Sequence, residues 1–488
     1  MNNVISSALL TVGMRWTDRL IGFVSTLILA RLLAPEDFGV IAMASLVIGL
    51  ADVLLDLGVN VALIRNASAT PADYDTAWTL RMVQAILATA IVAAAAPWAA
   101  VYFTEPRLVP VMLALSASFV LSAAENIGII TFQKEMLFTR DFKFLFTRRM
   151  FGFVVTIAAA FWLQSYWALV IGSLAGRAFG AGLSYVMHPM RPRLSLEKWR
   201  DIFAVSQWLL LRNSANFLDA RLHQMVVGRR EGTEVMGIYA LADEIAALPT
   251  TELLAPLNRV LFPAFVRVKD DLAELKRVYL LALGVQALIG VPAGVGLALV
   301  ADEAVQLLLG VKWRAAASFI EVIAIANVVS AIGVSGIYVM LTLDQSRFTA
   351  IYSWMQVFVF TAGAFLLLPE GGALSIAWLR LAVAIFGIGF FYAMLKRVLK
   401  DLRSVEIVAT IYRPLLAAAL MSAAVIELGT LAHWGVFPLI CAKIAFGALA
   451  YTTGVVVLWS VAGRPPGPEA YLIKNIRAFI DRGKSRRA

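Results

Sequence analysis

Ionisable side chains recur at helical spacing inside otherwise apolar stretches of this chain. Arg15 and Arg19 are four residues apart, as are Asp52 and Asp56, so each pair falls on one face of a helix. An ionisable group in an apolar span costs several kcal/mol unless it meets water or a partner, and for that reason it marks function by default. Such residues could bind a charged or polar ligand, or they could pair with one another and hold helices together.

Polar faces of this kind occur in four predicted helices, the first, second, seventh and eighth. In chain order their members are Arg15, Arg19, Gly22 and Thr26; Ser45, Gly49, Asp52, Asp56 and Asn60; Arg212, Asn216, Asp219 and His223; and Glu244, Ala247, Thr251, Leu254 and Asn258. Asp18, Asp243 and Glu252 lie beside these faces. A structural ion pair explains any single charge equally well, but four faces together favour a cavity lined by these helices.

Other ionisable residues stand alone in predicted spans or near their ends. They are Arg81, Arg177, Arg380 and Lys443, together with Glu125, Glu321 and Glu427. Snorkelling of the side chain to the membrane interface, or local pairing, explains such charges without a function.

The chain shows no motif for catalysis or for metal binding. Its one cysteine, Cys441, excludes an internal disulfide, and His188, His223 and His433 lie far apart, with no HExxH or CxxC spacing. The stretch RGKSRRA at 482–488 contains Gly-Lys-Ser, but Ala478 stands where a phosphate-binding loop needs its first glycine. We therefore predict no catalytic residue, no metal and no cofactor, which describes a protein that is not an enzyme.

The composition explains how so many apolar residues are buried. The chain has 488 residues, of which 61% are hydrophobic and 15% charged, whereas a soluble domain carries about a quarter charged residues. Stretches of about 20 apolar residues span a bilayer, so we predict an all-α polytopic membrane protein. Fourteen helices are expected, at 8–30, 38–63, 77–103, 108–131, 150–164, 166–187, 203–228, 235–263, 278–300, 316–341, 350–368, 373–395, 410–431 and 435–461.

Basic residues predict the orientation of these spans. If the N-terminus is cytoplasmic, the inner segments carry 26 of the 42 Lys and Arg residues and the outer loops carry six, which places both termini in the cytoplasm. The net charge of +10 then faces an anionic leaflet. Nucleic-acid binding is disfavoured because the basic residues are spread over every inner segment. The first residues lack a basic stretch, so we expect the first span to be retained.

Two hinges in the chain look like copies of each other. The sequence ARLLAPEDFGVIAMA, residues 30–44, aligns without gaps with GRREGTEVMGIYALA, residues 228–242, at a shift of 198 residues. Eight identical positions occur over some 44 residues, among them Arg31 with Arg229, Glu36 with Glu234, and Gly39 with Gly237. Chance similarity of two helix–loop–helix hairpins is the alternative.

A duplication predicts the organisation of the whole chain. The expected parts are a six-helix lobe at 1–190, a second lobe at 200–397, two additional helices at 405–462 and a basic cytoplasmic tail at 463–488. Six spans separate the copies, so both insert in the same direction, and transporters built from such repeats hold the substrate between them. The tail is expected to form a short amphipathic helix on the inner surface.

Prolines and glycines mark the hinges themselves. Pro35 fits the first turn of the helix that follows, where Glu36 and Asp37 complement the positive helix end. Within the eighth helix, Pro249 and Pro256 are expected to produce kinks, either static or mobile. The predicted hinge residues are Pro35, Gly39, Gly237, Pro249 and Pro256.

The stretch RWTDRLIGFVSTLILARLLAPEDFGVIAMASLV, followed by DLGVNVALIRN, resembles one known group of proteins. This group is the polysaccharide-export branch of the multidrug/oligosaccharidyl-lipid/polysaccharide flippase superfamily, and the similarity is greatest to flippases of O-antigen or colanic-acid-type repeat units. The resemblance implies a V-shaped transporter with two lobes and two extra helices in the bacterial inner membrane. It also implies alternating access, an undecaprenyl-diphosphate-linked oligosaccharide as substrate, and surface polysaccharide biosynthesis as the process served.

The same resemblance implies roles for the polar residues. Arginine suits a diphosphate because its planar fork makes bidentate hydrogen bonds. The positions that fit a diphosphate clamp are Arg15, Arg19 and Arg212, with Arg221 and Arg259 behind them. Candidates for ion coupling or for the polar wall of the cavity are Asp18, Asp52, Asp56, Asn60, Asn216, Asp219, Asp243, Glu244 and Asn258. Coupling to a proton or sodium gradient, a polysaccharide polymerase and a chain-length regulator as partners, and a monomeric state are further expectations.

Three alternatives remain open at this point. A cation-coupled multidrug exporter of the same superfamily would favour an acidic cavity, but acids and bases are nearly balanced here. A flippase for the peptidoglycan lipid precursor would share the cationic cavity. A membrane polymerase or glycosyltransferase acting on the same lipid carrier would normally need a sizeable outer loop, and the longest expected one, near 301–315, has about fifteen residues.

Overall fold

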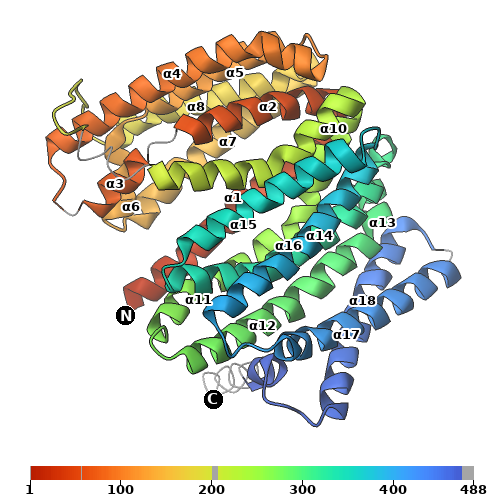
Figure 1. Cartoon of the computed structure of the whole chain (residues 1–488). Coiled ribbons are helices and arrows are strands. Elements are labelled where there is room, and N and C mark those ends of the chain that lie inside the picture. Colours follow the sequence, from red (N-terminus) through yellow and green to blue (C-terminus); the bar gives the residue numbers. More distant parts are fainter. Residues whose placement is uncertain (1, 56–57, 67, 200–206, 433, 475–488) are drawn as a thin grey trace, which may run out of the picture. The chain divides into compact units, whose positions relative to one another are not determined.

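The computed structural model describes residues 2–55, 58–66, 68–199, 207–432 and 434–474, and for 2–12, 14–16, 18, 61, 65 and 207–212 it describes the backbone only. Throughout these residues the regular elements are helices (Figure 1). The chain divides into two compact units, Met1–Ala240 and Leu241–Ala488. The limits expected for two six-helix lobes, 1–190 and 200–397, remain a prediction.

The first unit contains the helices drawn from red to yellow-green in Figure 1. They are α1 (Asn2–Leu32), α2 (Pro35–Leu55), α3 (Val59–Arg65), α4 (Pro71–Phe103), α5 (Leu108–Ala123), η1 (Ile127–Ile129), α6 (Ile130–Lys134), α7 (Phe138–Leu163), α8 (Trp167–Met187) and the larger part of α10 (Gln207–Leu248). Glycines allow α7 and α8 to pack closely, since a Cβ at Gly176 would lie 3.2 Å from the Cα of Gly152.

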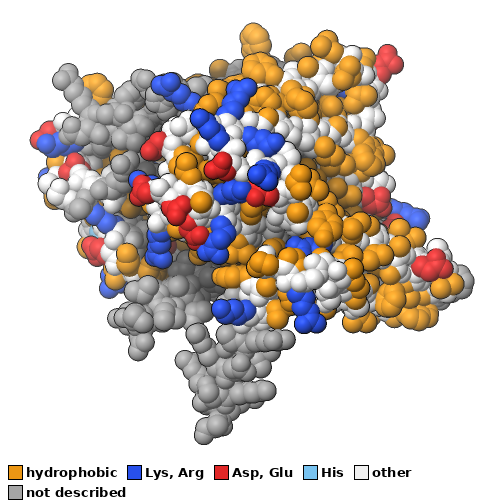
Figure 2. Space-filling model, turned by 60° about the horizontal axis from the view of Figure 1, so that its bottom comes forward, with side chains coloured by type: hydrophobic (Ala, Val, Ile, Leu, Met, Phe, Trp, Pro, Cys, Tyr) orange, Lys and Arg blue, Asp and Glu red, His pale blue; other side chains and the backbone are white. Residues whose placement is uncertain are grey.

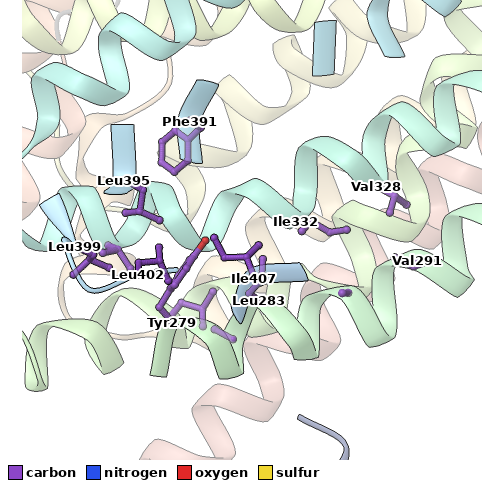
Figure 3. Close-up of a cluster of buried hydrophobic side chains, with 14 of the residues drawn as sticks. Tyr279, Leu283, Val291, Val328, Ile332, Phe391, Leu395, Leu399, Leu402 and Ile407 are labelled. Carbon is purple, nitrogen blue, oxygen red and sulfur yellow. The ribbon is translucent and has the colours of Figure 1, made fainter. Parts of the chain in front are cut away.

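The second unit continues from the end of α10. Its elements are the π-helix η2 (Pro249–Leu253), α11 (Ala255–Arg267), α12 (Leu272–Leu299), α13 (Ala301–Leu308), the short η3 (Val311–Trp313), α14 (Ala316–Thr342), α15 (Ser346–Ala362), the π-helix η4 (Gly363–Leu367), α16 (Ala373–Val398), α17 (Ser404–Leu431) and α18 (Val436–Val461). Figure 3 shows its core, where Tyr279 and Leu283 of α12 lie near Ile332 of α14 and Ile407 of α17.

Ten helices in the described part are long and apolar enough to cross a membrane, and the count rises to eleven if one bent pair forms a single span. Large apolar side chains such as Trp162 and Trp98 are 90% and 80% exposed. Figure 2 shows hydrophobic side chains over broad areas of the visible face, with basic and acidic side chains gathered in one part of it. The chain is therefore a multi-pass membrane protein. Charged residues lower the hydropathy of α1 and α10, so neither helix is among the ten. The expected count of fourteen spans remains a prediction.

Four of the expected spans differ from the structure in ways that hydropathy alone does not predict. The span expected at 150–164 begins at Phe138, because an amphipathic segment with Arg140 and Lys143 precedes the apolar part of α7. The span expected at 108–131 is broken after Ala123 and bends by 65°. The seventh and eighth spans run together as α10, which turns at Gly232 with a φ of 76°. Hydropathy averages over a window and cannot see such breaks.

Candidate functional site

Four of the sequence-predicted residues cannot be placed. Asp56 and the side chains of Arg15, Asp18 and Arg212 lie outside the described residues. Within the first unit, Arg19 is half-buried on α1. The other predicted residues there are exposed, namely Asp52 on α2, Asn60 on α3, and Asn216, Asp219 and Arg221 on α10. Their assignment to a substrate cavity stays a prediction.

One member of the predicted polar faces has a structural role instead. His223 is 1% exposed, and its Nδ1 lies 3.0 Å from the hydroxyl of the fully buried Tyr239. The Nε2 of His223 lies 2.9 Å from the carbonyl oxygen of Ala220, so this nitrogen donates and Nδ1 accepts from the tyrosine. The bond joins the two arms of α10 across the turn at Gly232.

In the second unit, Asp243 pairs with Arg380, which appears as an isolated charge in the sequence. Its Oδ1 lies 2.6 Å from Nη1 of Arg380 on α16, and the two side chains are 11% and 22% exposed. Nη2 of Arg380 donates to Oδ1 of Asn327 on α14 at 2.9 Å. The guanidinium of Arg380 therefore neutralises the carboxylate of Asp243. Asn258 accepts a hydrogen bond from the buried Gln286 at 2.9 Å, whereas Glu244 and Arg259 are exposed.

Replacing Asp243 with alanine is expected to destabilise the protein by about 3 kcal/mol, because it leaves Arg380 with an uncompensated charge in the interior. The double variant Asp243→Ala, Arg380→Leu should recover most of that loss. Thermal unfolding of the purified protein in detergent measures both, with Glu244→Ala at the exposed neighbouring position as control. Equal losses in the single and double variants would show that the ion pair is unimportant.

The first unit gathers charges that looked isolated in the sequence, at the break between α5 and α6. Arg81 of α4 donates through Nη2 to the carbonyl oxygen of Ser122 at 2.9 Å, and Arg177 of α8 donates to the Ser122 hydroxyl. Arg148 of α7 forms an ion pair with Glu125, with 2.8 Å between Nη1 and Oε1. We call Arg81, Arg148 and Arg177 the arginine cluster. These residues come from α4, α7 and α8, respectively (Figure 1).

The broken helix explains why these arginines meet. The last carbonyls of a helix have no partner inside it and carry partial negative charge, so a guanidinium is a favourable partner for Ser122. The buried Asn126 fixes the break, because its side-chain oxygen accepts from the amide of Gly128 at 2.9 Å and its Nδ2 donates to the carbonyl of Met190 at 2.7 Å. No local motif reveals the cluster, since its members are far apart in sequence.

The two hinges approach each other closely within the first unit. A Cβ at Gly39 would lie 1.8 Å from the backbone oxygen of Thr233, and one at Gly237 would lie 1.9 Å from the backbone oxygen of Pro35. At the proposed shift of 198 residues, Pro35 corresponds to Thr233 and Gly39 corresponds to Gly237. The two close contacts therefore involve equivalent positions of the proposed repeat, because each glycine faces the counterpart of the residue that the other glycine faces. The helix α2 begins at Pro35, with Glu36 and Asp37 in its first turn.

An ion pair between Arg107 and Glu105 lies beside these hinges, in the connection between α4 and α5. Arg107 donates through Nε and Nη2 to the two carboxylate oxygens of Glu105, both at 2.8 Å, and its Nη1 lies 3.7 Å from Glu36. The hydrogen bonds from Arg107 hold the pKa of Glu105 below its ordinary value. The stabilisation is present at neutral pH and is lost only as the pH falls below the ordinary glutamate range.

No group of three or more His, Cys, Asp or Glu residues in the described part of the chain is placed to hold a metal ion. The charged centres inside the helices are built mainly from arginine, which binds anions through fixed N–H donors. These residues are therefore suited to binding an anionic molecule.

Two characterised proteins are similar in sequence to this chain. It is 26% identical over 326 residues to the lipopolysaccharide biosynthesis protein WzxC of Escherichia coli, covering 64% of each chain. It is 24% identical over 340 residues to the teichuronic acid biosynthesis protein TuaB of Bacillus subtilis, covering 69% of this chain and 70% of that protein. The match thus spans about two thirds of the length of these relatives.

Solved structures and a family match complete the comparison. The lipid II flippase MurJ in an inward closed conformation has the same fold, with a TM-score of 0.74, 11% identity and coverage of 93% of this chain and 99% of that one. An inward-facing multidrug resistance MATE transporter matches at a TM-score of 0.55 and 16% identity, over 79% and 96% of the two chains. The family described as polysaccharide biosynthesis protein matches residues 28–318, which is more than half of the chain. This chain therefore belongs to the polysaccharide biosynthesis protein family.

Proposed function

We propose that this protein is a flippase that moves an undecaprenyl-diphosphate-linked oligosaccharide repeat unit across the bacterial inner membrane. The substrate would serve the synthesis of a surface polysaccharide, either an exopolysaccharide or an O-antigen. The observation that carries the proposal is the family match over residues 28–318. The arginines inside the membrane helices support it, because a diphosphate needs cations to leave water.

The proposal includes the finer architecture expected from the sequence. Fourteen membrane helices would form two six-helix lobes and two additional helices, with both termini in the cytoplasm. The lobes would expose the substrate site to each side in turn, and a proton or sodium gradient would drive the cycle without a cofactor. The first and second helices of each lobe would line the substrate path, with Arg15, Arg19 and Arg212 on the diphosphate. We expect the protein to act as a monomer beside a polymerase and a chain-length regulator, and not as an enzyme.

Deletion of the gene tests the proposal directly. We expect the host to lose a surface polysaccharide and to accumulate complete undecaprenyl-linked repeat units in the inner membrane, detected by mass spectrometry of lipid extracts. Expression of the intact protein should reverse both effects. If lipid-linked sugars and polysaccharide were unchanged and sensitivity to cationic dyes rose, the result would contradict this function and favour drug export.

A further inference from the structure

The arginine cluster holds more hydrogen-bonding capacity than its neighbours use. Each guanidinium carries five N–H donors. Within the described part of the chain, Arg81 donates only to a backbone carbonyl and Arg177 only to a serine hydroxyl. Among the described residues, Glu125 is the one carboxylate in ion-pair range, and it is taken by Arg148. Asp52 attracts Arg177 and Asp141 attracts Arg148 from greater distances. The cluster is therefore locally positive, with unused donors on Arg81 and Arg177.

Such a cluster is unusual in its location. Arg81, Arg148 and Arg177 lie in Pro71–Phe103, Phe138–Leu163 and Trp167–Met187, all of which qualify as membrane spans. Arg177 is ten residues from either end of α8 and has an exposed side chain. A guanidinium at that depth needs water or an anion. The broken span formed by Leu108–Ala123 and Ile127–Lys134 is a feature that accompanies binding sites in transporters.

We propose that Arg81, Arg148 and Arg177 form an anion-binding subsite of the first unit that takes a phosphate ester at the break between α5 and α6. This inference rests on the proposed function and makes the subsite a second station for the diphosphate of the polyprenyl carrier, in addition to Arg15, Arg19 and Arg212. The headgroup phosphate of a phospholipid is the other source of the same chemistry. Glycine at position 180 leaves the space that Arg148 occupies in the cluster, since a Cβ there would collide with the side-chain stem of Arg148.

A purely structural role for the arginine cluster leads to a different prediction for anion binding by the Glu125→Gln variant. If the arginines serve only to neutralise the broken helix and this carboxylate, then Glu125→Gln removes a useful partner and leaves anion binding unchanged. If they form an anion subsite, Glu125 competes with the ligand for Arg148. The substitution then strengthens anion binding, because it releases a charged donor to the ligand.

The experiment measures equilibrium binding of two lipids to the full-length protein in detergent by native mass spectrometry. The probes are undecaprenyl diphosphate and phosphatidylglycerol. We expect Arg177→Gln and Arg81→Gln each to weaken binding of undecaprenyl diphosphate by about tenfold, Arg177→Lys to weaken it less, and Glu125→Gln to strengthen it by about threefold. Arg314→Gln, at a side chain 80% exposed outside the spans, is the matched control and should change nothing.

The outcomes separate this inference from the proposed function. Weakening confined to undecaprenyl diphosphate supports the subsite with the carrier as its ligand, and equal weakening for phosphatidylglycerol supports it with phospholipid as the source. Unchanged affinity in both arginine variants and in Glu125→Gln overturns the subsite, even if gene deletion still stalls repeat units. Conversely, a deletion strain with normal lipid-linked sugars removes the proposed function, while weakened lipid binding in Arg177→Gln would still establish the subsite.

Discussion

Alanine at Gly39 or Gly237 is expected to lower the stability of the protein by about 3 kcal/mol and to reduce complementation of the deletion strain at least tenfold. The new Cβ would lie 1.8 Å or 1.9 Å from a backbone carbonyl oxygen of the facing hinge. Overpacked positions cost about 1–3 kcal/mol when side chains can yield, and here the obstacle is backbone. The helices α2 and α10 must then separate at their point of closest approach.

The two substitutions should also depend on each other. Because both enlarge the same crossing, the double variant Gly39→Ala, Gly237→Ala is expected to lose clearly less than the sum of the single losses. Thermal unfolding in detergent gives the stability terms, and surface polysaccharide in the complemented strain gives the activity.

A matched control comes from a glycine in open surroundings. Gly182 of α8 has no neighbour within 4 Å of a built Cβ, so Gly182→Ala should be neutral or slightly stabilising, as alanine is in a helix. Wild-type behaviour of both hinge variants, or losses that simply add, would mean that the hinges are not in the close contact described.

The sequence predicts the start of α2 well, because its signal is local. Proline at a first helical turn, followed by two acids, predicts the start of α2, and the structure begins that helix at Pro35. The alignment at a shift of 198 residues places Gly39 and Gly237 at equivalent positions. Their mutual approach could not be predicted, since an alignment says which positions correspond and not which ones touch.

The ion pairs show where prediction from sequence stops. Arg81, Arg177, Arg380 and Lys443 each stand alone in an apolar stretch, so the sequence predicts snorkelling or pairing for them but names no partner. In the structure Arg380 pairs with Asp243, 137 positions away, and Lys443 pairs with Glu303 across 140 positions. Helix periodicity identifies the face that carries a charge, but the partner depends on which helices pack together. Amphipathic and broken helices were missed for a related reason, because hydropathy records neither capping nor bends.

Removal of the carboxylate of Glu469 is the second substitution with a large expected effect. Its side chain is 2% exposed, and Oε1 lies 3.1 Å from Nε of Arg413 on α17, whose side chain is 6% exposed. Residues 468–474 are helical, and Pro468 packs where a Cβ at Gly284 of α12 would have to lie. The indole of Trp459 donates to the carbonyl of Pro465 at 3.1 Å. Pro468 and Glu469, at the start of this helix, are therefore packed within the second unit, and the expected helix on the inner membrane surface remains a prediction.

Glu469→Ala is expected to cost about 3–5 kcal/mol, because it leaves Arg413 as a buried charge without its partner. The double variant Arg413→Met, Glu469→Met should cost much less, since well-packed apolar residues often replace a buried ion pair at little expense. Glu427→Ala, at an exposed acid of the same helix α17, is the control for loss of a carboxylate.

Hydrogen exchange separates the local from the global consequence. The amide of Tyr471 donates to the carbonyl oxygen of Gly467 at 3.0 Å. Its exchange requires the helical segment 468–474 to open, so the rate reports the population of the opened state. We expect Glu469→Ala to accelerate this exchange at temperatures well below global unfolding, and the double variant to restore slow exchange. If Glu469→Ala exchanges as slowly as the intact protein, the apolar contact between Pro468 and Gly284, rather than the ion pair, holds the segment in place.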